Sequence, residues 1–258
     1  MKKTLLLFIG LSFLISCTND DSPTEVDSDQ NPVDFFPQNY IGTSGQLKKM
    51  KWTMGDGTPN SNWYFSYNGN KLDKKTSYNP INTIVYYDFQ YQYTNDLISE
   101  VYISNVMSED LNYDSQNRLI ERVGIGYKDE YEYLTNGIRW MRFTLDSNNN
   151  YVLNGDNLLI VDSTNQILEI KNYSNNTSVG IYEYDDKIAP MRNILGLNKL
   201  LSNFNQDDSI FNNITKQIDP LSGSNLLTIN YEYLNQKPIK ATYSNSSGIY
   251  LIIDLEYY

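Results

Sequence analysis

The chain has 258 residues, of which 20 are lysine or arginine and 31 are aspartate or glutamate, so its formal net charge is −11. An acidic surface argues against nucleic acid or anionic lipid as a partner, because both need cationic side chains to neutralise their phosphates. The chain contains no histidine and a single cysteine, which excludes Ser-His-Asp and Cys-His catalytic arrangements and the usual histidine-based zinc sites. We therefore expect no cofactor.

Residues 1–16 have the features of a cleaved secretion signal. Two lysines precede an apolar stretch over residues 5–15, and a small residue, Ser16, follows. The apolar stretch is too short to remain in a bilayer as a permanent helix. We therefore predict a signal peptide over residues 1–16, with cleavage between Ser16 and Cys17.

Residues 14–17, with the sequence LISC, resemble a bacterial lipobox, in which the cysteine is diacylated and becomes the new N-terminus. Each buried methylene of an acyl chain contributes about 0.8 kcal/mol, so several chains on one residue anchor a protein stably. Lipidation of Cys17 uses the only thiol of the chain, and loss of both signal lysines takes the net charge from −11 to −13. The alternative is an ordinary signal peptide that leaves Cys17 as a free thiol.

Residues 17–38 form an acidic segment rich in serine and proline. Such a segment cannot offset the entropy lost on ordering, so we predict the lipidated Cys17 followed by a flexible tether. Thr18 does not match the aspartate of inner-membrane retention, and Asp20 and Asp21 resemble the acidic export signal of Bacteroidetes surface lipoproteins. We expect lipid-anchored attachment to the outer membrane. The acidic pair favours its outer face, and the periplasmic face remains open.

Residues 39–258 are expected to form one β domain, organised around a repeated turn. Each repeat has an aromatic run, a turn rich in Asn, Asp and Gly, and then an aliphatic residue. Asn and Gly tolerate positive φ and fit tight turns between antiparallel strands. The clearest copies are residues 67–72, 113–119 and 133–138, and looser copies are residues 93–97, 162–167 and 233–239.

Around these turns the sequence alternates with a period of two. Tyr127, Asp129, Tyr131 and Tyr133 fall on one face, and the residues between them are lysine or glutamate. This alternation is typical of an antiparallel sheet with one packed and one solvated face. The 23 tyrosines suit such a surface, where we expect each ring to be buried and each hydroxyl hydrated. The pattern predicts an all-β fold, a long antiparallel meander.

The stretch from residue 189 to 224 breaks the pattern. Its apolar residues recur at helical spacing after Pro190, a favoured first-turn residue. We predict one short helical insertion near residues 190–202 that plugs or caps the sheet, with a partner-binding element as the alternative. The apolar residues are Met191, Ile194, Leu195, Leu197, Leu200 and Leu201.

Residues 113–122, YDSQNRLIER, resemble the YD repeat of the RHS type, with Asn117 where that repeat usually has glycine. Asn is the next-best residue for a left-handed turn. Residues 45–258 as a whole resemble a family of Bacteroidetes lipoproteins of unknown function with a porin-like fold. The resemblance implies YD-like hairpins that curl into an open or half barrel, and it implies no catalytic residues.

A barrel that spans the outer membrane is an alternative, because strands of this length and alternation can cross one. A lipid anchor would be redundant for such a barrel, and tyrosines occur throughout these strands. Tyr258 matches the terminal aromatic residue of spanning barrels, but its same-face neighbours Glu256 and Asp254 do not fit that signal. We therefore expect a barrel outside the bilayer.

Acidic residues are the candidate metal ligands and catalysts of this chain. Residues 146–150, DSNNN, begin like a calcium loop, but Tyr151 and Asn157 replace the required glycine and glutamate, so we predict a hairpin turn. A glycosidase needs two carboxylates at a fixed separation. The candidates alternate with tyrosine on one solvated face, and no pair stands out: Glu130, Glu132, Glu183, Asp185 and Glu232.

Trp52, Trp63 and Trp140 are the candidate ligand-binding residues, because tryptophan stacks on sugar rings. Their alternative role is to fill the core or the mouth of the barrel. We predict a monomeric, non-catalytic binding or structural module whose partner, besides the membrane, is a glycan or a protein. The alternatives are a carboxylate-dependent glycan-processing enzyme and an outer-membrane channel.

Replacement of Cys17 by alanine tests the anchor. We expect metabolic labelling with a palmitate analogue to mark the wild-type protein and to disappear in Cys17→Ala, because the thiol is the acylation site. Ser44→Ala, in the predicted β domain, serves as the control and keeps the label. Persistent labelling of Cys17→Ala would contradict lipidation at this residue.

Overall fold

The computed structural model describes residue 37, residues 40–201 and residues 212–258. All described residues belong to one compact unit, residues 34–258. The expected signal peptide, Cys17 and the tether over residues 17–38, apart from Pro37, lie outside the described residues. Among the described residues, no helix has the length and hydropathy needed to cross a membrane.

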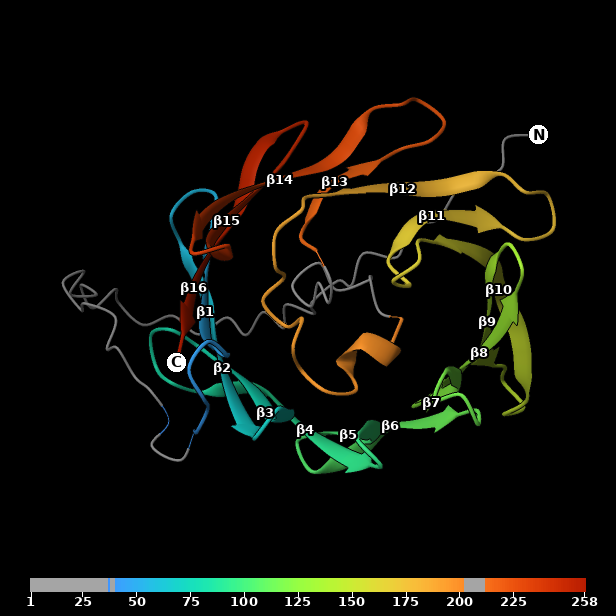
Figure 1. Ribbon diagram of the computed structural model, residues 1–258, viewed down its shortest axis with the longest axis horizontal. Helices are drawn as coiled ribbons and strands as arrows, with labels where there is room; N and C mark the ends of the chain where they lie inside the picture. The colour runs from blue at the N-terminus through green and yellow to red at the C-terminus, as the bar shows by residue number, and fades with distance from the viewer. Residues whose placement is uncertain (1–36, 38–39, 202–211) are drawn as a thin grey trace, which may run out of the picture. The chain divides into compact units, whose positions relative to one another are not determined.

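In the described part of the chain, sixteen antiparallel strands form a closed barrel in which neighbours in sequence are neighbours in the sheet (Figure 1). The all-β meander is confirmed, but the expected open or half barrel is wrong. β1 pairs with β16 from Leu47 opposite Tyr257 to Met54 opposite Leu251, so none of the described strands has an unpaired edge. The strands are β1 Leu47–Met54, β2 Pro59–Asn68, β3 Lys71–Tyr78, β4 Val85–Thr94, β5 Leu97–Ile103, β6 Val106–Tyr113, β7 Leu119–Gly124, β8 Tyr127–Leu134, β9 Gly137–Leu145, β10 Tyr151–Val161, β11 Ile167–Asn172, β12 Ser178–Tyr184, β13 Ile214–Ile218, β14 Asn225–Leu234, β15 Lys237–Asn245 and β16 Gly248–Tyr257.

The two ends of the barrel differ. Strands alternate in direction, so the turns after even-numbered strands lie at the end where β1 begins and β16 finishes. This end, which we call the plugged end, contains all the repeated turns of the sequence. The turns after odd-numbered strands lie at the opposite end, which we call the open rim.

Residues 188–201, here called the plug, follow β12 and lie inside the ring of strands (Figure 1). Met191, Ile194 and Leu197 are buried in the same core cluster as the barrel wall, as the sequence predicted for a plug. The helix expected near residues 190–202 is wrong within the described part: only a 3-10 turn, η1 (Leu197–Lys199), forms there. Gly196 precedes this turn in a left-handed conformation, with φ of 80°, which an α-helix does not accommodate.

The plug is an insertion into one copy of the repeated turn. In the short turn after β6, the amide of Arg118 donates to the Asp114 carboxylate (2.9 Å), and the Asp114 amide donates to the Arg118 carbonyl (2.9 Å). In the turn after β12, Asn213 and Asp185 make the same two bonds, at 3.1 and 3.0 Å. Asn213 thus takes the place of Arg118, and one aspartate holds both ends of the inserted segment. The main-chain amide of Arg118 and the other bonds of this turn keep the pKa of Asp114 below its usual value.

At the start of six of the seven strands that follow a plugged-end turn, an aliphatic residue is buried in the core, as is Leu47 at the start of β1. In β15 the buried residue at this position is Pro238. Together the aliphatic residues form a ring, the aliphatic ring, that packs in one cluster with the plug. No member exposes more than 2% of its surface, so each contributes on the order of 2 kcal/mol of hydrophobic stabilisation. The members are Leu47, Leu72, Ile98, Leu119, Ile138, Ile167 and Ile214.

Tyrosine hydroxyls extend the strand pairing at the plugged end. The β5–β6 ladder ends at Glu100 opposite Asp110, and beyond it the Tyr113 hydroxyl donates to the Ile98 carbonyl. The expectation that these hydroxyls are hydrated is therefore wrong, because they satisfy main-chain carbonyls of the aliphatic ring and its neighbours. Burial raises the pKa of Tyr113. The bonds of this kind are Tyr67 to Leu47 (2.7 Å), Tyr113 to Ile98 (2.8 Å), Tyr184 to Ile167 (2.6 Å), Tyr231 to Ile214 (3.1 Å) and Tyr257 to Pro238 (2.8 Å).

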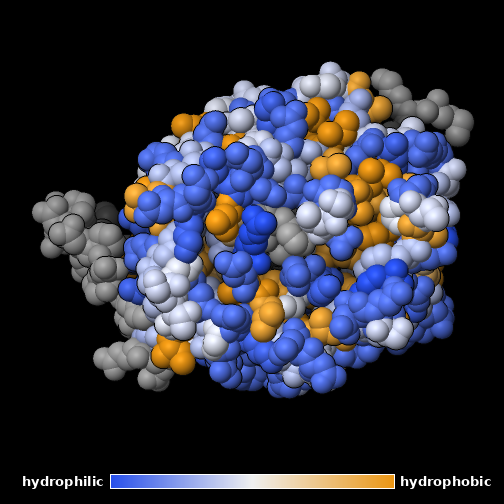
Figure 2. Space-filling model, in the orientation of Figure 1, coloured by the Kyte–Doolittle hydropathy of each residue, from blue (hydrophilic) through white to orange (hydrophobic). Residues whose placement is uncertain are grey.

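The outer face of the wall carries cross-strand and neighbouring ion pairs. Residues that alternate with the buried tyrosines point away from the lumen, and most are charged or polar, as the sequence predicted. Figure 2 looks down the ring of strands as Figure 1 does, and at this end of the barrel hydrophilic residues cover most of the surface and apolar residues gather in separate patches. The outer pairs include Lys74–Asp88 (3.1 Å), Lys128–Glu130 (2.5 Å), Arg139–Asp156 (2.9 Å), Lys216–Glu183 (2.7 Å) and Lys240–Glu232 (3.4 Å).

Removal of one of these tyrosine hydroxyls tests its contribution to the stability of the barrel. We expect Tyr113→Phe and Tyr184→Phe each to lower the free energy of unfolding by about 1 kcal/mol, because a buried carbonyl loses its donor. Urea titration followed by tryptophan fluorescence measures the change. Tyr173→Phe, on an exposed ring, is the control and leaves stability unchanged. Equal urea unfolding midpoints for all three variants and the wild type would show that these hydroxyl–carbonyl bonds do not stabilise the barrel.

Candidate functional site

The candidate site is a cavity of about 360 Å³ between the plug and the barrel wall. On β4 and β5, Tyr91 lies opposite Val101, and on β6 Glu109 lies opposite Val101. The alternation of each strand therefore directs a row of side chains from neighbouring strands into the lumen. The cavity is lined by Phe89, Tyr91, Val101, Ile103, Glu109, Arg122, Trp140 and Arg142 of the wall and by Leu197 and Leu200 of the plug.

Two arginine–carboxylate pairs stand among these residues. Arg122 donates to the Glu109 carboxylate, which also accepts the Tyr127 hydroxyl at 2.6 Å. Arg142 makes two bonds of 2.7 Å to Asp129, whose side chain is only 1% exposed. Although burial opposes its charge, the Glu109 carboxylate raises the pKa of Arg122. The polar wall of the cavity is thus charged but internally neutralised.

One donor of the Arg122 guanidinium is unsatisfied in the described part of the chain. Its Nε is buried and has no hydrogen-bond partner within residues 40–201 and 212–258. A buried unsatisfied donor costs about 1–3 kcal/mol. The guanidinium of Arg122 therefore combines a geometry fixed by Glu109 with one buried donor that has no partner among the described residues.

Aromatic side chains form the other part of the lumen wall. The Trp63 ring lies 6.0 Å from Trp52, 6.3 Å from Tyr87 and 6.1 Å from Phe89, centroid to centroid. Phe89 then continues into the cavity. Trp140 stands on β9, on the opposite side of the sixteen-strand ring from β1, with the Arg142 guanidinium 5.2 Å from its ring.

The three predicted tryptophans therefore fall into two groups. Trp52 and Trp63 pack together against the core, and Trp140 lines the cavity. Sequence reasoning missed Glu109, Arg122 and Arg142. Asp129, placed by the sequence on the packed face among tyrosines, was the available signal, since a charge on a packed face requires a buried partner.

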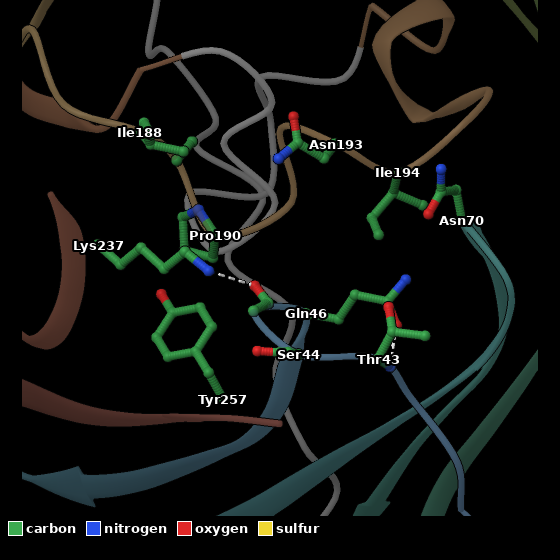
Figure 3. A pocket seen from close by; sticks show the side chains of 12 residues that line it. Thr43, Ser44, Gln46, Asn70, Ile188, Pro190, Asn193, Ile194, Lys237 and Tyr257 are labelled. Atoms are coloured by element: carbon green, nitrogen blue, oxygen red, sulfur yellow. Dashed lines mark hydrogen bonds between the residues drawn. The ribbon is translucent and has the colours of Figure 1, made fainter. Parts of the chain in front are cut away.

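A second, smaller cavity of about 160 Å³ lies at the plugged end. Figure 3 shows Lys237, Asn193 and Thr43 around it, contributed by β15, the plug and the segment that precedes β1. Lys237 Nζ donates to the Gly45 carbonyl at 2.6 Å and lies 5.1 Å from the Tyr257 ring. Lys237 therefore connects the segment before β1 to the barrel wall, and this cavity is a gap between packed structural elements.

The carboxylates that the sequence offered as catalysts lie elsewhere. Glu130, Glu132, Glu183 and Glu232 form ion pairs on the outer wall, and Asp185 holds the ends of the plug. The Asp146 carboxylate accepts the amides of the next turn residues at 2.8 and 2.9 Å, which confirms the predicted hairpin turn. In the described part of the chain, no group of three or more acidic or cysteine residues could hold a metal ion.

The Arg142–Asp129 pair gives a stability test. We expect Arg142→Met to lower the free energy of unfolding by about 2–3 kcal/mol, because the Asp129 carboxylate is left buried without its partner. The double variant Arg142→Met with Asp129→Leu recovers most of this loss. Arg139→Met, which breaks a pair on the outer wall, serves as the matched control and costs at most about 1 kcal/mol. Urea unfolding measures all four proteins, and equal losses in Arg142→Met and Arg139→Met would contradict a special role for the lumen pair.

No protein-family model matches the sequence, and no curated protein matches it. Among solved structures, a porin-like protein from Bacteroides vulgatus aligns with a TM-score of 0.39 and 12% identity, over 83% of this chain and 99% of that one. A porin-like protein from Bacteroides uniformis aligns with a TM-score of 0.37 and 11% identity, over 84% and 98%. At this identity the likeness concerns the fold alone, and the YD-repeat resemblance stays a prediction.

Proposed function

We propose that the protein is a lipid-anchored, non-catalytic binding module of the outer membrane whose lumen cavity binds a small saccharide. The observation that carries the proposal is the pairing of aromatic and charged walls around one cavity. Phe89, Tyr91 and Trp140 offer ring faces, and Glu109 and Arg122 offer fixed donors and acceptors. A sugar ring has apolar C–H faces and a polar edge, which match these two kinds of wall.

The size of the cavity supports a small ligand. Its volume of about 360 Å³ lies at the lower end of the range for small-molecule sites, which suits one or two sugar units. Because Arg122 and Arg142 are each neutralised by a carboxylate, the site offers no excess charge to an ionic ligand. A neutral saccharide therefore fits better than an anionic one.

The side chains of the outer wall are evidence for a barrel whose outer face contacts water. A spanning barrel needs an outward apolar band between two aromatic girdles, whereas here ion pairs such as Arg139–Asp156 and Lys216–Glu183 stand on the outward face of the strands. The lumen has the opposite character, with the aliphatic ring and the plug in one apolar cluster. This distribution is the inverse of the one that a channel through lipid requires.

The carboxylate arrangement supports binding without catalysis. A glycosidase needs two carboxyl groups on either side of the scissile bond. Glu109 is the one carboxylate that lines the cavity within residues 40–201 and 212–258, and it is engaged by Arg122 and Tyr127. The site therefore holds a ligand without a general acid and base placed around it.

A glycan array scored for binding and for turnover tests the proposal. The probe is the mature-length chain from residue 17 with Cys17→Ser, so that no acyl chain interferes. We expect selective binding of neutral glycans without product release, and at least a tenfold weaker affinity by calorimetry for Trp140→Ala and Arg122→Met. Arg139→Met, outside the barrel, is the control and binds as the wild type does.

Two outcomes would contradict the proposal. Cleaved glycan in the array supernatant would replace the binder with an enzyme. Binding that Trp140→Ala and Arg122→Met leave unchanged, in proteins with unaltered circular dichroism, would place the ligand outside the lumen cavity.

A further inference from the structure

The open rim concentrates the exposed apolar residues of the barrel. Leu221 is 88% exposed, Ile125 is 73% exposed and Ile81 is 70% exposed. Each of the eight hairpins at this end contributes at least one large apolar side chain to water. One from each hairpin, in chain order, gives Met54, Ile81, Val106, Ile125, Leu145, Tyr173, Leu221 and Ile249.

Elsewhere on the described surface such residues are few. They are Ile41, Ile120, Leu168, Leu195 and Leu234, and they lie in the plugged half of the barrel. Exposed apolar side chains that occur singly need no explanation, but a contiguous group marks a surface that contacts something apolar. The eight hairpins of the open rim each carry at least one, so these residues are concentrated at one end of the barrel instead of being scattered singly over the surface.

The polar residues of the rim carry almost no charge. Its eight turns contain no lysine or arginine, and their acids are Asp56, Asp146 and Asp219. Each of these carboxylates accepts a main-chain amide of its own turn, at 2.8, 2.8 and 3.0 Å. Main-chain and side-chain bonds from Thr58 lower the pKa of Asp56. These three carboxylates therefore stabilise their own turns through hydrogen bonds.

We propose that the open rim inserts into the headgroup region of a zwitterionic lipid surface. Its aliphatic tips are separated around the mouth of a barrel, so a deformable lipid layer can accommodate each one without a complementary shape. Tyr86, Tyr87, Tyr151 and Tyr173 are at least 39% exposed at this rim, and tyrosine favours the interface between headgroups and hydrocarbon. The neutral Asn and Ser of the turns fit the same layer.

The charge of the protein favours a zwitterionic lipid surface over a second copy of the chain or an anionic lipid surface. A second copy of the chain would bring together two bodies with a net charge of −11 each before processing, which opposes close contact. An anionic lipid surface is opposed for the same reason, and the rim offers no cation to offset it. A zwitterionic surface carries no net charge and meets neither obstacle.

The anchor proposed at Cys17 is compatible with this contact. β1 begins at Leu47, at the plugged end. Residues 40–46 are bonded to the barrel, which leaves residues 18–39 as the tether. A fully extended chain covers up to about 3.6 Å per residue, so a tether of this length can reach farther than the length of a ten-residue strand, about 33 Å. The lipid anchor and the rim can therefore engage the same leaflet.

Flotation with phosphatidylcholine vesicles tests the rim. The protein is the mature-length chain from residue 17 with Cys17→Ser, which removes the acyl contribution. We expect it to float with the vesicles, and we expect the variant Ile81→Ser, Val106→Ser, Ile125→Ser and Leu221→Ser to lose at least tenfold in partition coefficient. The matched control carries Ile41→Ser, Ile120→Ser, Leu168→Ser and Leu234→Ser and partitions as the wild type does.

Three outcomes would overturn the proposal. The first is that the wild-type chain stays with the soluble fraction at every lipid concentration. The second is that both quadruple variants, with unchanged circular dichroism, lose vesicle binding equally. The third is a concentration-dependent dimer in sedimentation that the rim variant alone abolishes, which would assign the rim to a second copy. Replacing a third of the lipid with phosphatidylglycerol should weaken binding, and stronger binding would contradict the charge argument.

Discussion

The width of a sixteen-strand barrel is the constraint on which the rest of this structure depends. Eight strands enclose a lumen that side chains of the wall can fill, whereas sixteen enclose a wider space that either holds water or needs another segment. Here the plug supplies Met191, Ile194 and Leu197 to the interior. The aliphatic ring meets them from the wall. A core therefore forms in a barrel whose own side chains could not make one.

Local features of this fold were accessible from the sequence. Positive-φ residues such as Asn117 mark the turns, and the two-residue alternation around Asp129 assigns the faces of β8 correctly. Closure was not accessible, because it depends on pairing between Leu47 and Tyr257, which are far apart in the chain. No local pattern reports strand number and stagger, and these decide whether a meander closes.

The site was predictable in part for a similar reason. Tryptophans stand out in a sequence, and all three lie on the inner wall or its core. The arginines do not stand out, since Arg122 and Arg139 each lie within the first four residues of a strand that follows a repeated turn. One faces Glu109 in the lumen and the other faces Asp156 outside. Strand register alone separates these roles, and a bulge before the turn shifts that register in most plugged-end hairpins.

The hold of Asp185 on Asn213 has a consequence for how this protein can vary. These two residues reproduce the bonds of an uninterrupted turn. The pairing of β12 with β13 therefore does not depend on the sequence of the segment inserted between them. A segment of another length or composition can be exchanged at this point while the wall keeps its register. Leu197 and Leu200 form the floor of the lumen cavity. The same barrel can therefore present a different cavity lining when this one inserted segment is replaced.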